Sequence, residues 1–184
     1  MSVQTRAQLQ ASSATIANET VAAANTASRV GGLFDDLADT ATLDRERGFA
    51  NLYIDTDTSF APTQGQRVKL TSTMRSGVLS TYNFSRTTNS LTYTGTTSAT
   101  LRIAASMVLA QNNNTQIKVY IAKNGTPIDQ SMTDITTTHT NGHAIYTEAY
   151  VTGAVNDVFT IYINAIDSGA SITISALSFT AHTL

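Results

Sequence analysis

The chain has 184 residues and a mass of 19.6 kDa, and 69 of its residues are Thr, Ser, Asn or Gln. Only 13% are charged, against roughly 25% in a typical soluble domain. There is no Cys, which excludes a disulfide framework, a thiolate metal site and a cysteine nucleophile. The apolar fraction of 41% is too high for a disordered chain.

The charge distribution argues against nucleic acid and membranes as partners. Residues 51–184 carry seven basic and seven acidic side chains, with no basic stripe to neutralise phosphates. The longest apolar stretch, residues 103–110, falls far short of the ~20 residues that span a bilayer. The polar first ten residues lack a secretory apolar region. We therefore expect synthesis in a cytoplasm and release by lysis.

The first 43 residues predict an α-helical stem. They are Ala-rich, contain no Pro, and place apolar side chains seven residues apart, which is typical of a coiled-coil seam. Gly31 and Gly32 interrupt this pattern and predict a helix end or bend. The alternative is a single amphipathic helix that lies on its own domain. The predicted stem contacts are Leu9, Ile16, Ala23, Val30, Leu33, Phe34 and Leu37.

A charged linker, residues 44–51, precedes a strand-rich head, residues 52–184. Thr is abundant in the head, and its β-branched side chain favours strands. Period-two alternation with one polar face is typical of antiparallel sheets. The predicted strands cover residues 52–54, 66–71, 78–81, 91–94, 100–109, 116–123, 135–138, 143–152, 158–166 and 171–181. This pattern predicts a mainly β, antiparallel jelly-roll sandwich.

Two turns stand out in the head. Asn124-Gly125 and Asn141-Gly142 supply the positive φ that tight hairpins need. Each is therefore predicted to connect two paired strands.

Two strands of the head carry apolar or aromatic residues on both faces. A sandwich strand has only one inner face, so the second face predicts contact with a neighbouring subunit. The alternative is scattered surface aromatics, which are common. The predicted head contacts of a homotrimer are Tyr146, Tyr150, Phe159 and Tyr162.

The sequence contains no catalytic constellation. The head has seven acidic residues without a defined acid–base spacing, and no nucleophile elbow or phosphate-binding loop occurs. His139 and His143 could converge across a hairpin, and three copies around an axis could then bind a metal, but a solvated hairpin end is the favoured interpretation. Asp55-Thr56-Asp57 lacks the Gly and distal Glu of a calcium loop and predicts a polar linker. We expect no enzyme activity, no cofactor and no metal.

Aromatic and amide side chains in predicted loops suit sugar binding, because rings stack on sugars and amides bond hydroxyls. Ordinary turn chemistry is the alternative, since Asn is common in loops. The candidate receptor contacts are Tyr82, Phe84, Tyr93, Asn112, Asn113 and Asn114.

Several segments resemble a known family of phage proteins. The resemblance lies in residues 91–95, 101–106, 119–125, 153–163 and 171–179, with residues 25–37 similar to a segment that precedes the distal domains of phage fibres. The head resembles the small trimeric jelly rolls of phage structural proteins, which are similar in fold to C1q and tumour-necrosis-factor domains.

The resemblance implies a homotrimer with an N-terminal helical stem and a β head, in a virion fibre, spike or capsid decoration. The predicted function is therefore structural, with the N-terminal segment anchored to other virion proteins on head or tail. The alternative is a tip protein that binds a host surface glycan.

Overall fold

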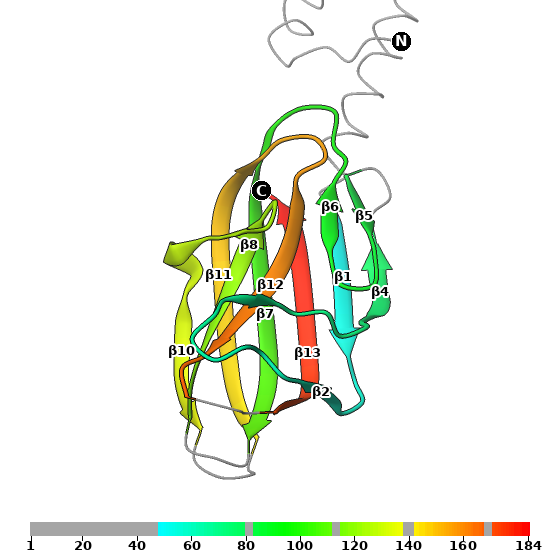
Figure 1. Cartoon of the computed structure of the whole chain (residues 1–184). Helices are drawn as coiled ribbons and strands as arrows, with labels where there is room; N and C mark the ends of the chain where they lie inside the picture. The colour runs from blue at the N-terminus through cyan, green and yellow to red at the C-terminus, as the bar shows by residue number, and fades with distance from the viewer. Residues whose placement is uncertain (1–47, 80–82, 112–114, 138–141, 168–170) are drawn as a thin grey trace, which may run out of the picture. The chain divides into compact units, whose positions relative to one another are not determined.

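The computed structural model describes residues 48–79, 83–111, 115–137, 142–167 and 171–184 (Figure 1). These residues belong to one compact unit, Gly48–Leu184. The predicted stem contacts, residues 9–37, lie outside the described residues. Among the described residues, no helix is long and apolar enough to cross a membrane.

The strands form two antiparallel sheets that pack face to face. Sheet A has the order β11-β7-β13-β1-β4, with β2 paired to β13. Its strands are β1 (Phe49–Ile54), β2 (Thr58–Phe60), β4 (Arg75–Leu79), β7 (Ala99–Gln111), β11 (His143–Gly153) and β13 (Ile172–Thr183).

Sheet B has the order β10-β8-β12-β6-β5, with β3 paired to β12 and β9 to β8. Its strands are β3 (Val68–Lys69), β5 (Phe84–Arg86), β6 (Leu91–Tyr93), β8 (Thr115–Lys123), β9 (Thr126–Pro127), β10 (Thr133–Thr137) and β12 (Val158–Ala165). The antiparallel two-sheet sandwich is the architecture that the alternation predicted.

Each predicted strand overlaps an observed one, and three short strands were not predicted. The unpredicted strands are β2, β5 and β9, which are two or three residues long. A strand of that length shows no period that can be recognised in a sequence.

The core lies between the two inner faces and is built from alternate residues of the long strands. In β7, Leu101, Ile103 and Leu109 are fully buried. Phe84 and Phe159 of sheet B and Phe179 of β13 belong to the same buried cluster. Burying a Phe or Leu side chain stabilises the fold by roughly 1.5–3 kcal/mol.

One of the two predicted hairpins is present. Asn124 (φ 51°) and Gly125 (φ 80°) join β8 to β9, and these two strands pair. The prediction of a hairpin at Asn141-Gly142 is wrong, because β10 pairs with β8 whereas β11 pairs with β7. The chain therefore passes from sheet B to sheet A between β10 and β11. The strand partners decide this connection, and the local turn residues do not.

A short 3₁₀ helix, η1 (Asp129–Ser131), closes the sandwich edge between β8 and β11. The buried Ser131 hydroxyl accepts a hydrogen bond from the Ile121 N–H at 2.9 Å and donates to the Ile128 carbonyl at 2.7 Å. The Thr147 hydroxyl of β11 donates to the Ser131 carbonyl. Ser131 therefore ties both sheets to the closing segment.

Replacing Ser131 with Ala should destabilise the protein by about 1–3 kcal/mol, because the buried Ile121 N–H loses its acceptor. Urea unfolding followed by circular dichroism measures this change. Ser59→Ala, at an exposed position of β2, should change stability by less than about 0.5 kcal/mol. Equal effects of the two substitutions would contradict the role given to Ser131.

Candidate functional site

The outer face of sheet A carries side chains in rows that cross four strands. The strand register places residues opposite one another on β11, β7, β13 and β1. The first row is Tyr146, Ser106, Ser178 and Tyr53, the second is Glu148, Ala104, Thr180 and Asn51, and the third is Tyr150, Arg102, His182 and Phe49.

In the first two rows the small side chains occupy the middle strands and the larger ones the flanks. Ser106, Ala104, Ser178 and Thr180 lie on β7 and β13. Tyr146 and Tyr150 on β11 keep 47% and 60% of their surface exposed, although Tyr is a large and partly apolar residue. A low centre beside exposed aromatic rings is a shape against which another protein surface can pack.

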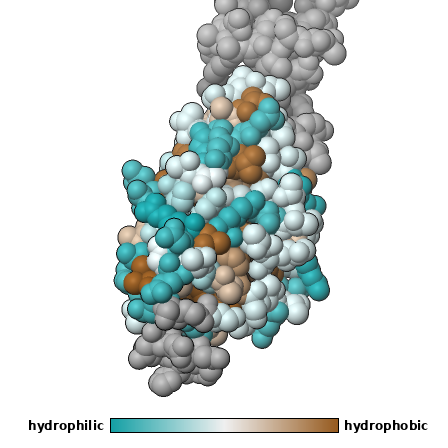
Figure 2. Space-filling view, viewed as in Figure 1, coloured by the Kyte–Doolittle hydropathy of each residue, from teal (hydrophilic) through white to brown (hydrophobic). Residues whose placement is uncertain are grey.

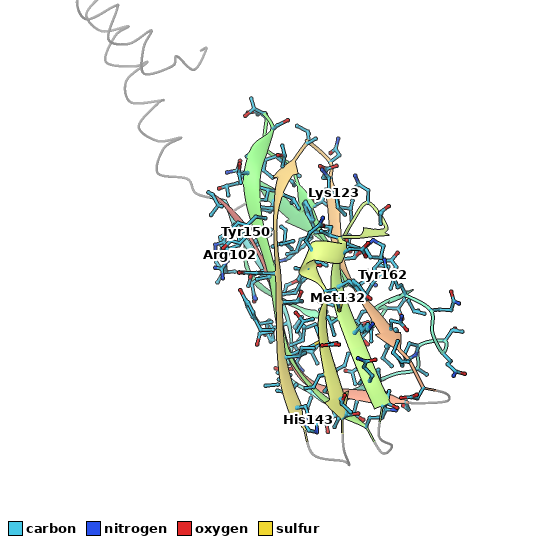
Figure 3. All side chains as sticks on the ribbon, turned by 90° about the vertical axis from the view of Figure 1, so that its left-hand side faces the viewer. Arg102, Lys123, Met132, His143, Tyr150 and Tyr162 are labelled. Atoms are coloured by element: carbon cyan, nitrogen blue, oxygen red, sulfur yellow. The ribbon has the colours of Figure 1, made fainter. Side chains whose placement is uncertain are left out.

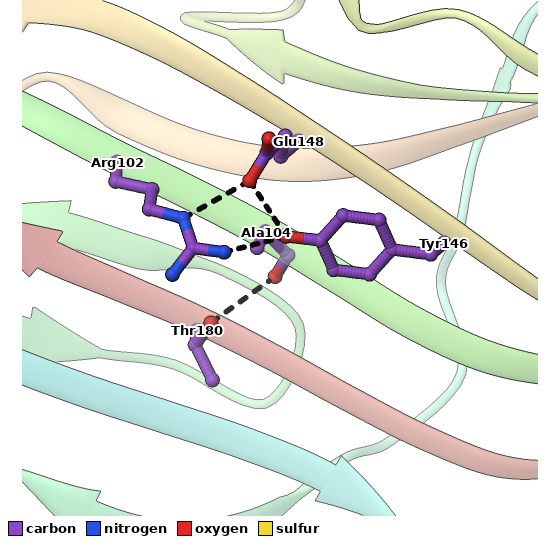
Figure 4. Close-up of polar contacts among 5 residues, drawn as sticks. All are labelled: Arg102, Ala104, Tyr146, Glu148 and Thr180. Carbon is purple, nitrogen blue, oxygen red and sulfur yellow. Dashed lines mark hydrogen bonds and ion pairs between the residues drawn. The ribbon is translucent and has the colours of Figure 1, made fainter.

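Arg102, Tyr146 and Glu148 form a polar cluster on this face (Figure 4). The Arg102 Nε donates to Glu148 Oε2 at 3.0 Å, and its Nη2 donates to the Tyr146 hydroxyl oxygen at 2.7 Å. The Tyr146 hydroxyl in turn donates to Glu148 Oε2 at 2.6 Å. The three side chains are therefore joined pairwise by hydrogen bonds.

The cluster holds its charges at ordinary pH. The hydrogen bonds from Tyr146 and then Arg102 lower the pKa of Glu148. The hydrogen bond to Glu148 raises the pKa of Arg102, and burial raises the pKa of Tyr146. The cluster is thus an ion pair with a neutral phenol, and the lowered pKa makes the Glu148 carboxylate a weaker base than an ordinary one.

Of the four predicted head contacts, two lie on this face. Tyr146 and Tyr150 project from β11, and Figure 3 shows Tyr150 with Arg102 on one side of the sandwich and Tyr162 on the other. Tyr162 is half-buried on the outer face of sheet B, where its register partner is Tyr120. The four residues therefore do not form one surface.

The prediction that Phe159 contacts a neighbouring subunit is wrong. Its side chain has 0% exposure and belongs to the core. The outer positions of the same strand, Thr160 and Asn164, are also buried within the unit, at 3% and 8% exposure. The outer side of β12 is thus covered by its own chain at Thr160 and Asn164, and these positions need no second subunit.

The prediction of Phe84 and Tyr93 as exposed receptor contacts is also wrong. They have 1% and 3% exposure and pack edge to face, with ring centroids 5.6 Å apart. The Tyr93 hydroxyl donates to the Thr97 carbonyl at 2.8 Å, and burial raises the pKa of Tyr93. The other candidates, Tyr82 and Asn112 to Asn114, lie outside the described residues.

Metal-ligating groups do not gather among the described residues, where no cluster of three or more His, Asp or Glu occurs. Asp55 is ion-paired with Arg75 at 2.9 Å. His143 faces inward opposite Leu109, and His139 lies outside the described residues.

Polar groups elsewhere on the head pair locally. On the far side from the outer face of sheet A, the Arg67 guanidinium lies 4.6 Å from the Tyr120 ring centroid and pairs with Asp129 at 2.8 Å. At the β8–β9 turn, Lys123 pairs with Asp157 at 2.7 Å. In Figure 2, the visible face mixes hydrophilic residues with small hydrophobic spots.

The alternation of residues 143–152 places Glu148 on one strand face with Tyr146 and Tyr150, but it does not show that Arg102, His182 and Phe49 share that face. The neighbours on β7, β13 and β1 could not be assigned, because pairing partners are far apart in the sequence.

Comparison with known proteins shows the fold and no more. No protein-family model and no curated protein matches the chain. Among solved structures, murine APRIL at pH 5.0 matches with a TM-score of 0.54 and 10% identity, over 75% of this chain and 99% of that one. Murine APRIL at pH 8.0 matches with a TM-score of 0.50 and 8% identity, over 74% and 99%.

Eiger TNF from S. frugiperda has a TM-score of 0.48 and 8% identity, over 75% of this chain and 94% of that one. At these identities the likeness to murine APRIL describes the backbone alone. The head is a two-sheet antiparallel jelly roll like that of tumour-necrosis-factor domains.

Replacing Tyr146 with Phe should raise the pKa of Glu148 toward its ordinary value, because the hydrogen bond that lowers it most is removed. A carbon-13 NMR titration of the Glu148 carboxyl group measures this change. Tyr150→Phe removes a hydroxyl from the same strand face and should leave that pKa unchanged. A Glu148 titration that is identical in the Tyr146→Phe protein and the unmodified protein would contradict the cluster.

Proposed function

We propose that this chain is a structural subunit of a phage virion, a fibre or spike whose β heads associate as a homotrimer. The observation that carries the proposal is the outer face of sheet A, where exposed tyrosines flank small side chains. The sequence resemblance to trimeric phage jelly rolls and fibre segments supports the virion setting. In this proposal residues 1–43 anchor the trimer to other virion proteins.

The energetics of the face favour burial against another protein. A buried Tyr removes roughly 150–250 Å² from water. Burying an unpaired charge is costly, but Arg102 and Glu148 are already paired and hydrogen-bonded. The ion pair can therefore be covered without leaving an uncompensated charge.

A three-fold arrangement suits the face. A head-to-tail contact that repeats by a three-fold rotation closes on itself and leaves no open end. A stem tethered to such a head gains from high effective concentration, so even a weak coiled coil forms once the heads have met. The neutral, hydroxyl-rich head keeps long-range electrostatic repulsion between subunits small.

We expect the unmodified chain to have a mass near 59 kDa in solution, which is three times 19.6 kDa. Ser106→Arg should reduce it to the single-chain mass, because a long charged side chain would rise from the low centre of the face. Size exclusion with light scattering measures both. Thr136→Arg, at an exposed position of sheet B, should leave the trimer intact. A mass near 20 kDa for the unmodified chain would contradict the proposal of a trimer.

The virion setting has its own test. Gold-labelled antibodies against the chain should decorate purified phage particles at fixed positions in electron micrographs. Antibodies absorbed with the purified chain should not. Particles without label, in a preparation whose lysate contains the chain, would argue against a virion role.

The alternative function is a tip protein that binds host glycan. Its described candidates, Phe84 and Tyr93, are buried, so the structural role is the proposed function. Incubating the full chain with host cells and purified surface glycans separates the two. Saturable binding that free glycan competes away would favour the tip protein.

A further inference from the structure

The third row of the outer face of sheet A contains a histidine between an aromatic ring and an arginine. The His182 ring lies 4.6 Å from the Phe49 ring, centroid to centroid, with the ring planes inclined at 56°. Its register partner on the other side is Arg102 of β7. His182 is half-buried even though it lies on an outer face.

The backbone holds His182 in this position. The Thr183 N–H donates to the Gly48 carbonyl at 3.0 Å, and the Leu184 N–H donates to the Thr100 carbonyl at 3.0 Å. The Thr183 hydroxyl also accepts a hydrogen bond from the Gly48 N–H at 2.7 Å. The end of β13 is thus tied to the chain on both flanks, which holds the His182 backbone beside those of Phe49 and Arg102.

Among the described residues packed around His182, Arg102 is the charged group that faces it. β1 contributes Phe49, which is neutral, and β13 itself contributes Thr180. On β11, Tyr150 is neutral, and Glu148 Oε2 is occupied by Arg102 and Tyr146. A carboxylate therefore does not offset a second positive charge in this row.

We propose that protonation of His182 loosens the contact between heads, so that the assembly dissociates in mild acid. The inference rests on the proposed function, because it requires a second copy of the chain on the outer face of sheet A. Covering His182 with another subunit would remove more of its water and bring the imidazolium and Arg102 together in a drier setting. Both effects disfavour the charged imidazole.

The sign of the pH effect follows from linkage. Burial, and then the charge of Arg102, already lower the pKa of His182 in the single subunit. Association lowers it further, so the separated subunit binds more protons than the assembled one. Association is then unaffected above the pKa of the free subunit and weakens as pH falls through it. Carboxylates with ordinary pKa values near 4 stay mostly ionised down to about pH 5.

The test is the association of the full chain at about pH 8 and about pH 5, where His is the side chain whose ordinary pKa lies between the two. Sedimentation velocity over a concentration series gives the midpoint of dissociation, which is the protein concentration at which half of the assembly has dissociated. We expect that midpoint to rise severalfold in acid, since each pH unit below the pKa of the free subunit weakens association by at most about tenfold per excluded proton. The His182→Gln protein should assemble equally well at both pH values.

Two other substitutions serve as matched controls. His139→Gln and His143→Gln remove the other two histidines of the chain and should keep the acid response. Histidine NMR titrations add an independent readout, since His182 should titrate at lower pH in the unmodified assembly than in the Ser106→Arg single chain. Equal pKa values in the two would overturn the inference.

The outcomes separate the inference from the proposed function. An assembly whose midpoint is the same at both pH values would overturn the acid response and leave the trimer standing. Acid dissociation that persists in His182→Gln would also overturn it, because another group would then be responsible. A chain that is single at both pH values would overturn the trimer, and this inference with it.

Discussion

The antiparallel pairing of β7 with both β11 and β13 is the constraint on which the head depends. β7 pairs with β11 from residue 99 to 109 and with β13 from residue 101 to 111, with one shift near Ala176. Because the side-chain period of a strand is two, this register decides for every residue of β7 whether its side chain faces the core or the outside. Leu101 and Ile103 enter the core, and Arg102 and Ala104 therefore appear outside.

The outer face of sheet A follows from that register. A slip of β7 by one residue would turn Arg102 toward the core and away from Glu148, and would leave apolar side chains of β7 in water. With the observed register, Arg102, Tyr146 and Glu148 are joined pairwise by hydrogen bonds. The face thereby combines small side chains, exposed rings and paired charge, which is the combination that makes it suitable for covering by another subunit.

Intrachain polar contacts join β8, η1 and β11 at the edge of the sandwich. Ser131 and Thr147 bind β8, η1 and β11 together, and Arg67 covers the ring of Tyr120 on the opposite sheet. The proposed association instead uses the outer face of sheet A, where exposed tyrosines flank small side chains. The histidine in its third row connects that association to acidity.

Local patterns in the sequence determined the class of the head, the positions of its long strands and the Asn124-Gly125 hairpin. These features depend on neighbouring residues, through side-chain alternation and the positive φ of the turn. The tertiary structure decided which strands pair, and so placed Phe159, Phe84 and Tyr93 in the core and brought His182 between Phe49 and Arg102. The sequence around an aromatic residue in a strand looks the same whether its side chain faces the core or the outside. Only the pairing between segments far apart in the sequence decides which face is buried.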